Sequence, residues 1–251
     1  ITGYNAQDLI SKPAFRNAAI DTLKELADLC ADGPMVAIGG PWSEGKSVFN
    51  AYFLLQSGKI CSVVEKHHLP NESVFDEVRI FDSGKIGGPY SVGNTRIGSP
   101  ICEDAWHEDV VETHVETGAE FLLIPNGSPY HRGKRDERLN NMVSRVIESA
   151  LPLIYLNMVG GQDDQVFDGG SFVLNPGGAL AVQLPMFEEA TVQIILKRGY
   201  AGWLVTEGEK ASTPDQHQAD YHAMVLGLKD YCAKSGFKKV LLGLSGGIDS
   251  A

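Results

Sequence analysis

Cysteine is scarce in this sequence. Its 251 residues include four cysteines, and none are spaced as in the CxxC motifs of metal or redox sites. So few cysteines in a chain of this length argue against a disulfide framework and favour reduced thiols, as in cytosolic proteins.

Basic residues and long apolar runs are also in short supply. The 21 basic residues are outnumbered by 32 acidic ones, which gives a net charge of −11. A non-specific binder of nucleic acid or of anionic membranes would need a basic surface, so neither class of partner is expected. No apolar run approaches the roughly 18 residues of a membrane-spanning helix. We therefore expect a cytoplasmic protein.

The remaining composition is that of a folded protein. Apolar residues make up 43% of the sequence, which is enough to build a core and argues against disorder. Apolar periodicity predicts helices at residues 14–30, 106–115, 139–150 and 221–232. Strands are expected at residues 35–39, 49–56, 59–64, 96–101, 121–125, 153–157, 171–174, 179–184, 192–196 and 238–244.

The order of these elements suggests two domains. Hairpins mixed with strand–helix–strand units predict a layered α/β domain over residues 1–195. Residues 196–220 are polar with weak periodicity, so we interpret them as a linker. Residues 221–251 begin a second, doubly wound α/β domain. The sequence starts without methionine and stops inside a motif, so we interpret it as part of a longer protein.

Cys102 stands where a predicted strand ends and a helix begins, in Ile101-Cys102-Glu103-Asp104. Amides at a helix N-terminus favour an anion, so a thiolate would be stabilised there. This is the arrangement of a nucleophile elbow, although the GxSxG pattern is absent. The alternative is a buried structural cysteine. The polar and acidic residues that follow the strand favour the nucleophile.

Lys66 follows another predicted strand and precedes His67-His68-Leu69-Pro70, where a loop would leave a sheet. A functional cation and an ordinary surface lysine are both compatible with this pattern, and the surface lysine is the more frequent case.

A glycine-rich turn closes the sequence. A predicted strand runs into Ser-Gly-Gly-x-Asp-Ser at residues 245–250. Glycines let the backbone approach an oxyanion closely, and amides and hydroxyls can hold phosphate. The turn lacks the Gly-Lys-Ser ending of a Walker A loop. A turn without a ligand is the alternative, but the added Ser, Asp and Ser favour a phosphate site.

Together these motifs resemble a known family. Residues 245–250 are similar to the pyrophosphate loop of the N-type ATP pyrophosphatases. Lys66…Leu69-Pro70 and Ile101-Cys102-Glu103-Asp104…Trp106 resemble the lysine and cysteine motifs of the nitrilase superfamily. The glutamine-dependent NAD+ synthetases join these motifs in this order, and the segments 75–77, 126–134 and 159–172 agree. The resemblance implies a nitrilase-like α-β-β-α sandwich, followed by the start of a doubly wound α/β adenine-nucleotide-binding domain.

The resemblance also implies roles for individual residues. Cys102 would attack the side-chain amide of glutamine and form a glutamyl thioester, while Lys66 would stabilise the oxyanion. The family's general-base glutamate would lie just upstream of Ile1. Five residues match positions of the glutamine pocket: Tyr4, Phe75, Glu77, Ser128 and Lys134. Lys134 stands where some members carry Arg.

In the second domain, the resemblance implies that ATP phosphates bind to Ser245, Gly246, Gly247, Ile248, Asp249 and Ser250. Mg2+ would be the counter-ion, with ligands that the motif does not identify. No prosthetic group is implied, and a homo-oligomer is expected.

The implied reaction converts glutamine, deamido-NAD+ and ATP into NAD+, glutamate, AMP and pyrophosphate. Such an enzyme is a carbon-nitrogen ligase with glutamine as amido donor. A stand-alone nitrilase-superfamily amidase is the main alternative, although residues 221–251 argue against it. A non-catalytic module without the general base is the other.

Overall fold

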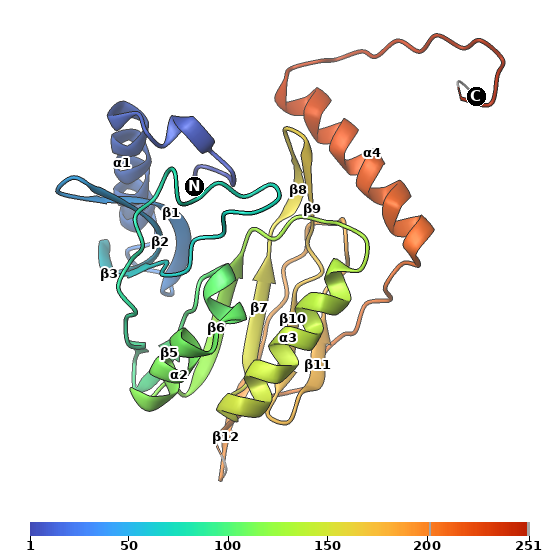
Figure 1. Cartoon of the computed structure of the whole chain (residues 1–251). Helices are drawn as coiled ribbons and strands as arrows, with labels where there is room; N and C mark the ends of the chain where they lie inside the picture. The colour runs from blue at the N-terminus through green and yellow to red at the C-terminus, as the bar shows by residue number, and fades with distance from the viewer. Residues whose placement is uncertain (201, 250–251) are drawn as a thin grey trace.

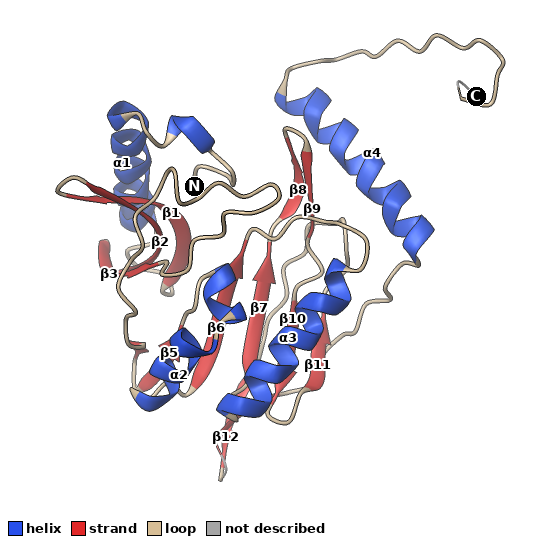
Figure 2. Ribbon diagram, viewed as in Figure 1, coloured by secondary structure: helices blue, strands red, loops and turns tan. Residues whose placement is uncertain are grey.

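The computed structural model describes residues 1–200 and 202–249, whose main elements form four layers (Figures 1 and 2). Helix α1 (Pro13–Leu29) covers one face of an antiparallel sheet. The strands of this sheet are β1 (Val36–Glu44), β2 (Ser47–Gln56) and β3 (Lys59–Glu65). A six-stranded sheet lies against its other face, and α2 (Glu108–Glu116) and α3 (Lys134–Ser149) cover the far side. This order of layers is the predicted α-β-β-α sandwich.

The six-stranded sheet is mixed. Its middle pairs, β5 with β6 and β6 with β7, are parallel, and the outer pairs are antiparallel. In spatial order the strands are β11 (Ala179–Gln183), β10 (Phe172–Asn175), β7 (Leu153–Asn157), β6 (Phe121–Asn126), β5 (Thr95–Gly98) and β4 (Tyr90–Val92). The carboxyl ends of parallel strands are where open α/β sheets place their ligand sites. The segments after β5 and β6 carry Cys102 and Gly127, so the candidate site lies at this edge.

Alternating side chains of β2 join three layers. Phe53 and Leu55 face α1, where they pack with Leu23. Tyr52 points the other way, into a cluster with Ile101 and Cys102 at the second sheet. This alternation is the period of two that a strand buried on both faces requires. It places the nucleophile candidate at the interface between the sheets.

The predicted hairpins are present. β2 and β3 are joined by Ser57 and Gly58, both with positive φ (50° and 75°), as a tight two-residue turn requires. β10 and β11 form the second predicted hairpin. Four further hairpins were not predicted from the sequence: β1 with β2, β4 with β5, β8 (Val159–Gln162) with β9 (Gln165–Asp168), and β12 (Leu196–Gly199) with β13 (Gly202–Val205).

Three predictions around the boundary region are wrong. The strand expected at 192–196 contributes only its last residue to β12, and the proposed linker contains the β12–β13 hairpin. Leu196 and Val205 of that hairpin cover apolar side chains of β10 and β11 instead of meeting solvent. Residues 238–244 form no strand, because the segment runs exposed beyond α4 without a pairing partner among the described residues (Figure 1).

Helix α4 (Gln216–Lys234) is present as predicted, but a different face is buried. The apolar stripe that predicted it is largely exposed, with Tyr221 at 61% and Leu228 at 62%. The buried face consists of the small residues Ala219 and Ala223, which pack near Phe187. None of the described helices is long and apolar enough to cross a membrane.

Candidate active site

Cys102 begins a short 3₁₀ helix, Cys102–Trp106, after the segment that follows β5. Its backbone adopts a positive φ of 50°, a conformation that costs a non-glycine residue energy and is often retained at functional sites. The side chain is 9% exposed and lies on the wall of a cavity. The sharp turn at Cys102 is therefore the elbow-like geometry expected from the sequence.

The charges around Cys102 set the state of its thiol. Burial raises the pKa of the thiol, and the ammonium of Lys66 opposes this effect. The carboxylates of Glu77 and Glu103 raise the pKa further, whereas the backbone amide of Gly127 lowers it. The balance is a raised pKa. At neutral pH the thiol is protonated at rest, so a base must take its proton before it can act as a nucleophile.

Lys66 lies in a fully buried ion pair. Its Nζ donates to Glu77 Oε2 at 2.6 Å, and the two side chains are 1% and 0% exposed. Asn50 Nδ2 donates to the other oxygen of Glu77 at 2.9 Å. Burial lowers the pKa of Lys66, but the interactions with Cys102 in its thiolate form and with the Glu77 carboxylate outweigh this effect and leave the pKa raised. Lys66 is thus a fixed cation beside the thiol, and the surface-lysine alternative is wrong.

Asp104 ties the lysine loop to the cysteine turn. Its Oδ1 accepts the backbone amides of His67 (3.1 Å) and His68 (2.7 Å), and its Oδ2 accepts that of Ile101 (3.0 Å). The carboxylate is 2% exposed. Because these amides flank Lys66 on one side and Cys102 on the other, Asp104 fixes the separation of the two. The sequence motif contained Asp104, but its partners became visible only in the structure.

Two cavities lie near this site. The first, of about 240 Å³, is lined by Cys102, Lys66 and Tyr4, and by the segment Ile1–Gln7. The second, of about 580 Å³, is lined by Phe75 and the residues Glu103, Trp106, Tyr130 and Lys134. The ring of Tyr4 in the first cavity and the ring of Phe75 in the second lie 6.2 Å apart between centroids.

Lys134 supplies a cation to the second cavity. Its Nζ lies 4.2 Å from the centroid of the Trp106 ring and 3.1 Å from a carboxylate oxygen of Glu137. Its side chain is only 18% exposed. Ala223 and Met224 of α4 line the same cavity, so the helix that follows the sandwich forms part of its wall.

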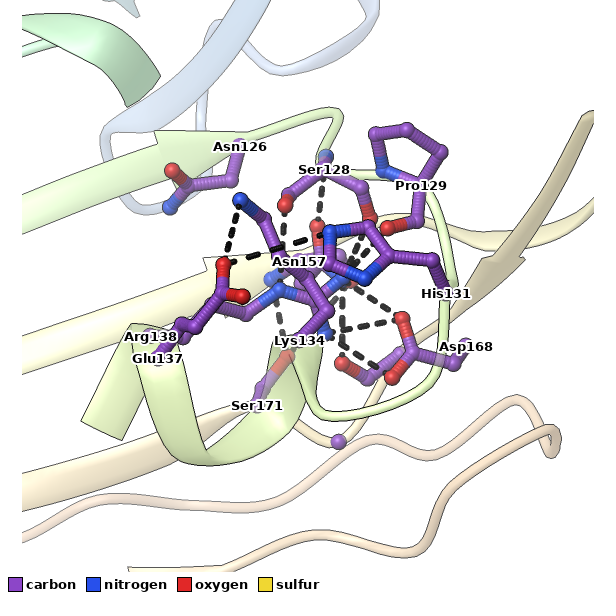
Figure 3. Close-up of polar contacts among 12 residues, drawn as sticks. Asn126, Ser128, Pro129, His131, Lys134, Glu137, Arg138, Asn157, Asp168 and Ser171 are labelled. Carbon is purple, nitrogen blue, oxygen red and sulfur yellow. Dashed lines mark hydrogen bonds and ion pairs between the residues drawn. The ribbon is translucent and has the colours of Figure 1, made fainter. Parts of the chain in front are cut away.

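Figure 3 shows how the loop after β6 is held in place. Arg138 donates from Nε to Ser128 Oγ at 3.0 Å and from Nη1 to Asp168 at 2.8 Å, and this ion pair is almost fully buried. Asn157 Oδ1 accepts the amide of Ser128 at 2.9 Å, and its Nδ2 donates to the carbonyl of Ser128 at 3.1 Å. Nothing in the sequence pointed to this network, because its members come from α3, β7, β9 and the loop after β6.

The five predicted glutamine-pocket residues occupy different places. Tyr4 lines the first cavity, and Phe75 and Lys134 line the second. Glu77 and Ser128 line neither: Glu77 is paired with Lys66, and Ser128 is 4% exposed and bound to Arg138. A direct contact of these two with substrate stays a prediction.

The predicted phosphate loop is not assembled into a site in this chain. Residues 245–249 are exposed and line neither cavity, and Ser250 lies outside the described residues. Within the loop, Gly247 N donates to Ser245 Oγ at 3.3 Å. Among the described residues, the one group of three or more possible metal ligands does not include Asp249. The described loop therefore does not by itself fit a magnesium site.

Comparison with protein families divides the chain into two segments. The carbon-nitrogen hydrolase model matches residues 1–202, and the NAD synthase model matches residues 220–251.

Individual relatives match both segments. The glutamine-dependent NAD(+) synthetase of Rhodobacter capsulatus is 53% identical over 251 residues, which cover 100% of this chain and 46% of the relative. The enzyme of that name from Xanthomonas campestris pv. campestris is 39% identical over 265 residues, which cover 100% of this chain and 46% of the relative. The chain thus spans about half the length of the curated relatives it matches.

Solved structures agree with this division. A glutamine-dependent NAD+ synthetase from Acinetobacter baumannii, in complex with ADP, has a TM-score of 0.90 and 32% identity, covering 99% of this chain and 47% of the other. An amidase from Nesterenkonia sp. has a TM-score of 0.62 and 23% identity, and the match covers 73% of this chain and 69% of the amidase. This likeness shows a shared fold.

Proposed function

The chain belongs to the carbon-nitrogen hydrolase family, and on that premise we propose that it contains the glutamine-hydrolysing part of a glutamine-dependent NAD+ synthetase. The observation that carries the proposal is the convergence of Cys102 and the buried cation of Lys66 on one cavity. The match of residues 220–251 to the NAD synthase model supports ammonia transfer as the purpose of the hydrolysis.

The reaction starts when a base takes the proton of the Cys102 thiol. The thiolate attacks the amide carbon of glutamine, and the carbonyl oxygen takes up the negative charge. The Lys66 ammonium stabilises this oxyanion as a preorganised, buried cation. The carbon–nitrogen bond then breaks, the leaving nitrogen takes a proton and departs as ammonia, and a thioester remains. Water hydrolyses the thioester to glutamate. The general base stays the glutamate predicted upstream of Ile1.

Glu77 serves this step by holding Lys66 in place. The 2.6 Å ion pair fixes the ammonium at one position, and Asn50 occupies the second oxygen of the carboxylate. A buried lysine without such a partner would lose its proton more readily, because burial disfavours the charged form.

The second cavity suits the amino-acid end of glutamine. The Lys134 ammonium there can pair with the α-carboxylate while the side-chain amide reaches Cys102 past the Tyr4–Phe75 pair. A lysine pairs as a point charge, without the bidentate fork of an arginine.

Ammonia from this site would react with adenylated deamido-NAD+ in the second domain, with ATP converted to AMP and pyrophosphate. Residues 245–250 would contribute to binding the ATP phosphates. We derive no step through Mg2+, because the described residues of the loop bring no set of ligands together. Homo-oligomer formation stays an expectation from the resemblance.

The test is NAD+ formation by the whole protein from deamido-NAD+, ATP and Mg2+, with glutamine or ammonium as the nitrogen donor. Cys102→Ala should abolish the glutamine-driven rate and leave the ammonium-driven rate unchanged. The same rate with either donor in the variant would contradict the assignment of Cys102.

A stand-alone amidase is the second candidate, because the Nesterenkonia fold covers 73% of the chain. Hydrolysis of glutamine or simple amides without NAD+ formation from either donor would favour it.

A further inference from the structure

A cluster of histidines lies directly beside the lysine loop, outside the two cavities described above. One ring nitrogen of His67, one ring nitrogen of His68 and a carboxylate oxygen of Asp109, all of them possible metal ligands, lie within 4.8 Å of one another. None of the three residues lines either cavity. They come from two separate elements, the loop after β3 and the first turn of α2.

The tautomer of His67 is fixed by its surroundings. Its Nδ1 lies 2.7 Å from the carbonyl oxygen of Gly84, and a carbonyl can only accept a hydrogen bond. Nδ1 therefore carries the proton in the neutral ring, and Nε2 has the lone pair. A backbone carbonyl that orients one ring nitrogen in this way is the usual outer partner of a metal-binding histidine.

His68 and Asp109 are already in contact. The Nε2 atom of His68 lies 2.8 and 3.0 Å from the two carboxylate oxygens of Asp109. The ring of His107 stacks on that of His68, with centroids 3.9 Å apart and an interplanar angle of 24°. This stacking limits rotation of the His68 ring. Asp109 Oδ1 also accepts the amide of Val110 at 2.8 Å, so Oδ2, which lies 3.0 Å from His68 Nε2, has fewer partners and is the oxygen that would turn to a cation.

We propose that His67, His68 and Asp109 form a binding site for a divalent transition-metal ion of the Zn2+ class. Two imidazoles and a carboxylate are ligands that Zn2+ accepts, with bonds of about 2.0–2.2 Å. A tetrahedral ion would draw its ligands to about 3.4 Å from one another. His68 Nε2 and the Asp109 oxygens are closer than this, at 2.8 and 3.0 Å, because they share a proton that the ion would replace, and small side-chain rotations would bring the three ligands to the spacing of a bound ion.

The position of the site gives the ion a structural effect. His67 follows Lys66 directly, and the amides of His67 and His68 both bind Asp104. An ion held by these rings and by Asp109 would tie the lysine loop to the start of α2. The site is separate from the proposed nucleophile, so the inference does not depend on the proposed function.

Metal binding to the 251-residue chain tests the proposal directly. Calorimetric titration with ZnCl2 should show one equivalent per chain, and added Zn2+ should raise the melting temperature by mass action. Cobalt(II) should give the visible bands of a tetrahedral site without the near-ultraviolet band of a thiolate ligand. His68→Ala and Asp109→Asn should each weaken binding at least ten-fold and remove the thermal shift.

Two variants serve as controls. His217→Ala removes an exposed histidine on α4 and should keep full binding. Cys102→Ala removes the thiol of the candidate active site and should keep full binding as well. Absence of binding in the wild-type chain, unchanged binding in both cluster variants, or loss of binding in Cys102→Ala would each overturn the proposal.

Discussion

The buried Lys66–Glu77 pair predicts a strongly non-additive pair of substitutions. Lys66→Met leaves the Glu77 carboxylate, 0% exposed, with Asn50 as its remaining side-chain partner. Glu77→Leu leaves the Lys66 ammonium buried without its counter-charge. Removing one member of a buried ion pair costs about 3–5 kcal/mol, because the other charge cannot reach water. Each single variant should lose this much free energy of unfolding.

The double variant Lys66→Met/Glu77→Leu should be more stable than either single one. It buries two apolar side chains of similar volume instead of one uncompensated charge, and such replacements are often neutral. The amide of Asn50 loses its acceptor, which costs about 1–3 kcal/mol. We therefore expect the double variant to lose about 1–3 kcal/mol relative to the wild type.

Urea unfolding of the four proteins near neutral pH measures this cycle, with tryptophan fluorescence and circular dichroism as probes. The rate of Cys102 alkylation by iodoacetamide provides a second measurement. It should fall in every variant without Lys66, because that cation lowers the pKa of the thiol. If the two single losses add up in the double variant, the pair is not electrostatically coupled and our account of the site is wrong.

Three further predictions concern groups around the site. Burial lowers the pKa of His114 from 6.5 to about 4. The contribution of the neutral ring to the free energy of unfolding is therefore intact above about pH 6.5, and it is lost as the pH falls towards 4, because the unfolded chain takes up the proton first. Urea unfolding should show a loss of up to about 3 kcal/mol over that range, absent in His114→Leu but retained in His131→Gln. Gly84→Ala should lower the free energy of unfolding by about 3 kcal/mol, because a Cβ there would lie 3.0 Å from the Lys66 carbonyl oxygen and closer still to the Cβ of Glu65. Thermal unfolding measures this loss. Asp104→Ala leaves three backbone amides without their acceptor, and should both destabilise the chain by at least about 2 kcal/mol in urea and slow the alkylation of Cys102.

The sequence predicted the features of the site that depend on local chemistry. Cys102 was expected at a strand-to-helix turn, and it lies at one, with the positive φ of a sharp elbow. The role of Glu77 was not predictable in the same way. Its partner Lys66 is eleven residues away, and Asn50 lies on β2 whereas Lys66 and Glu77 lie after β3, so only the fold brings the three together.

Other errors have a physical cause in tertiary packing. The apolar stripe of α4 predicted the helix, because the period of 3.6 is a local property. Which face is buried depends on the neighbours, and here the small face with Ala223 packs against the sandwich. The strand expected at 238–244 failed for a related reason: a strand needs a hydrogen-bonding partner, which periodicity alone cannot supply.

The contacts of α4 explain why the two matched segments cannot be treated as independent. Asp230 accepts the amide of Gly161 at 2.7 Å, and Asp220 pairs with Arg132 at 2.6 Å and with the hydroxyl of Tyr130 at 2.7 Å. These contacts hold the helix on β8 and on the loop after β6, so that its residue Met224 lines the second cavity. A displacement of α4 would therefore change the cavity that we assign to the amino-acid end of glutamine. The structure thus provides a direct physical link between the segment that matches the NAD synthase model and the candidate glutamine site.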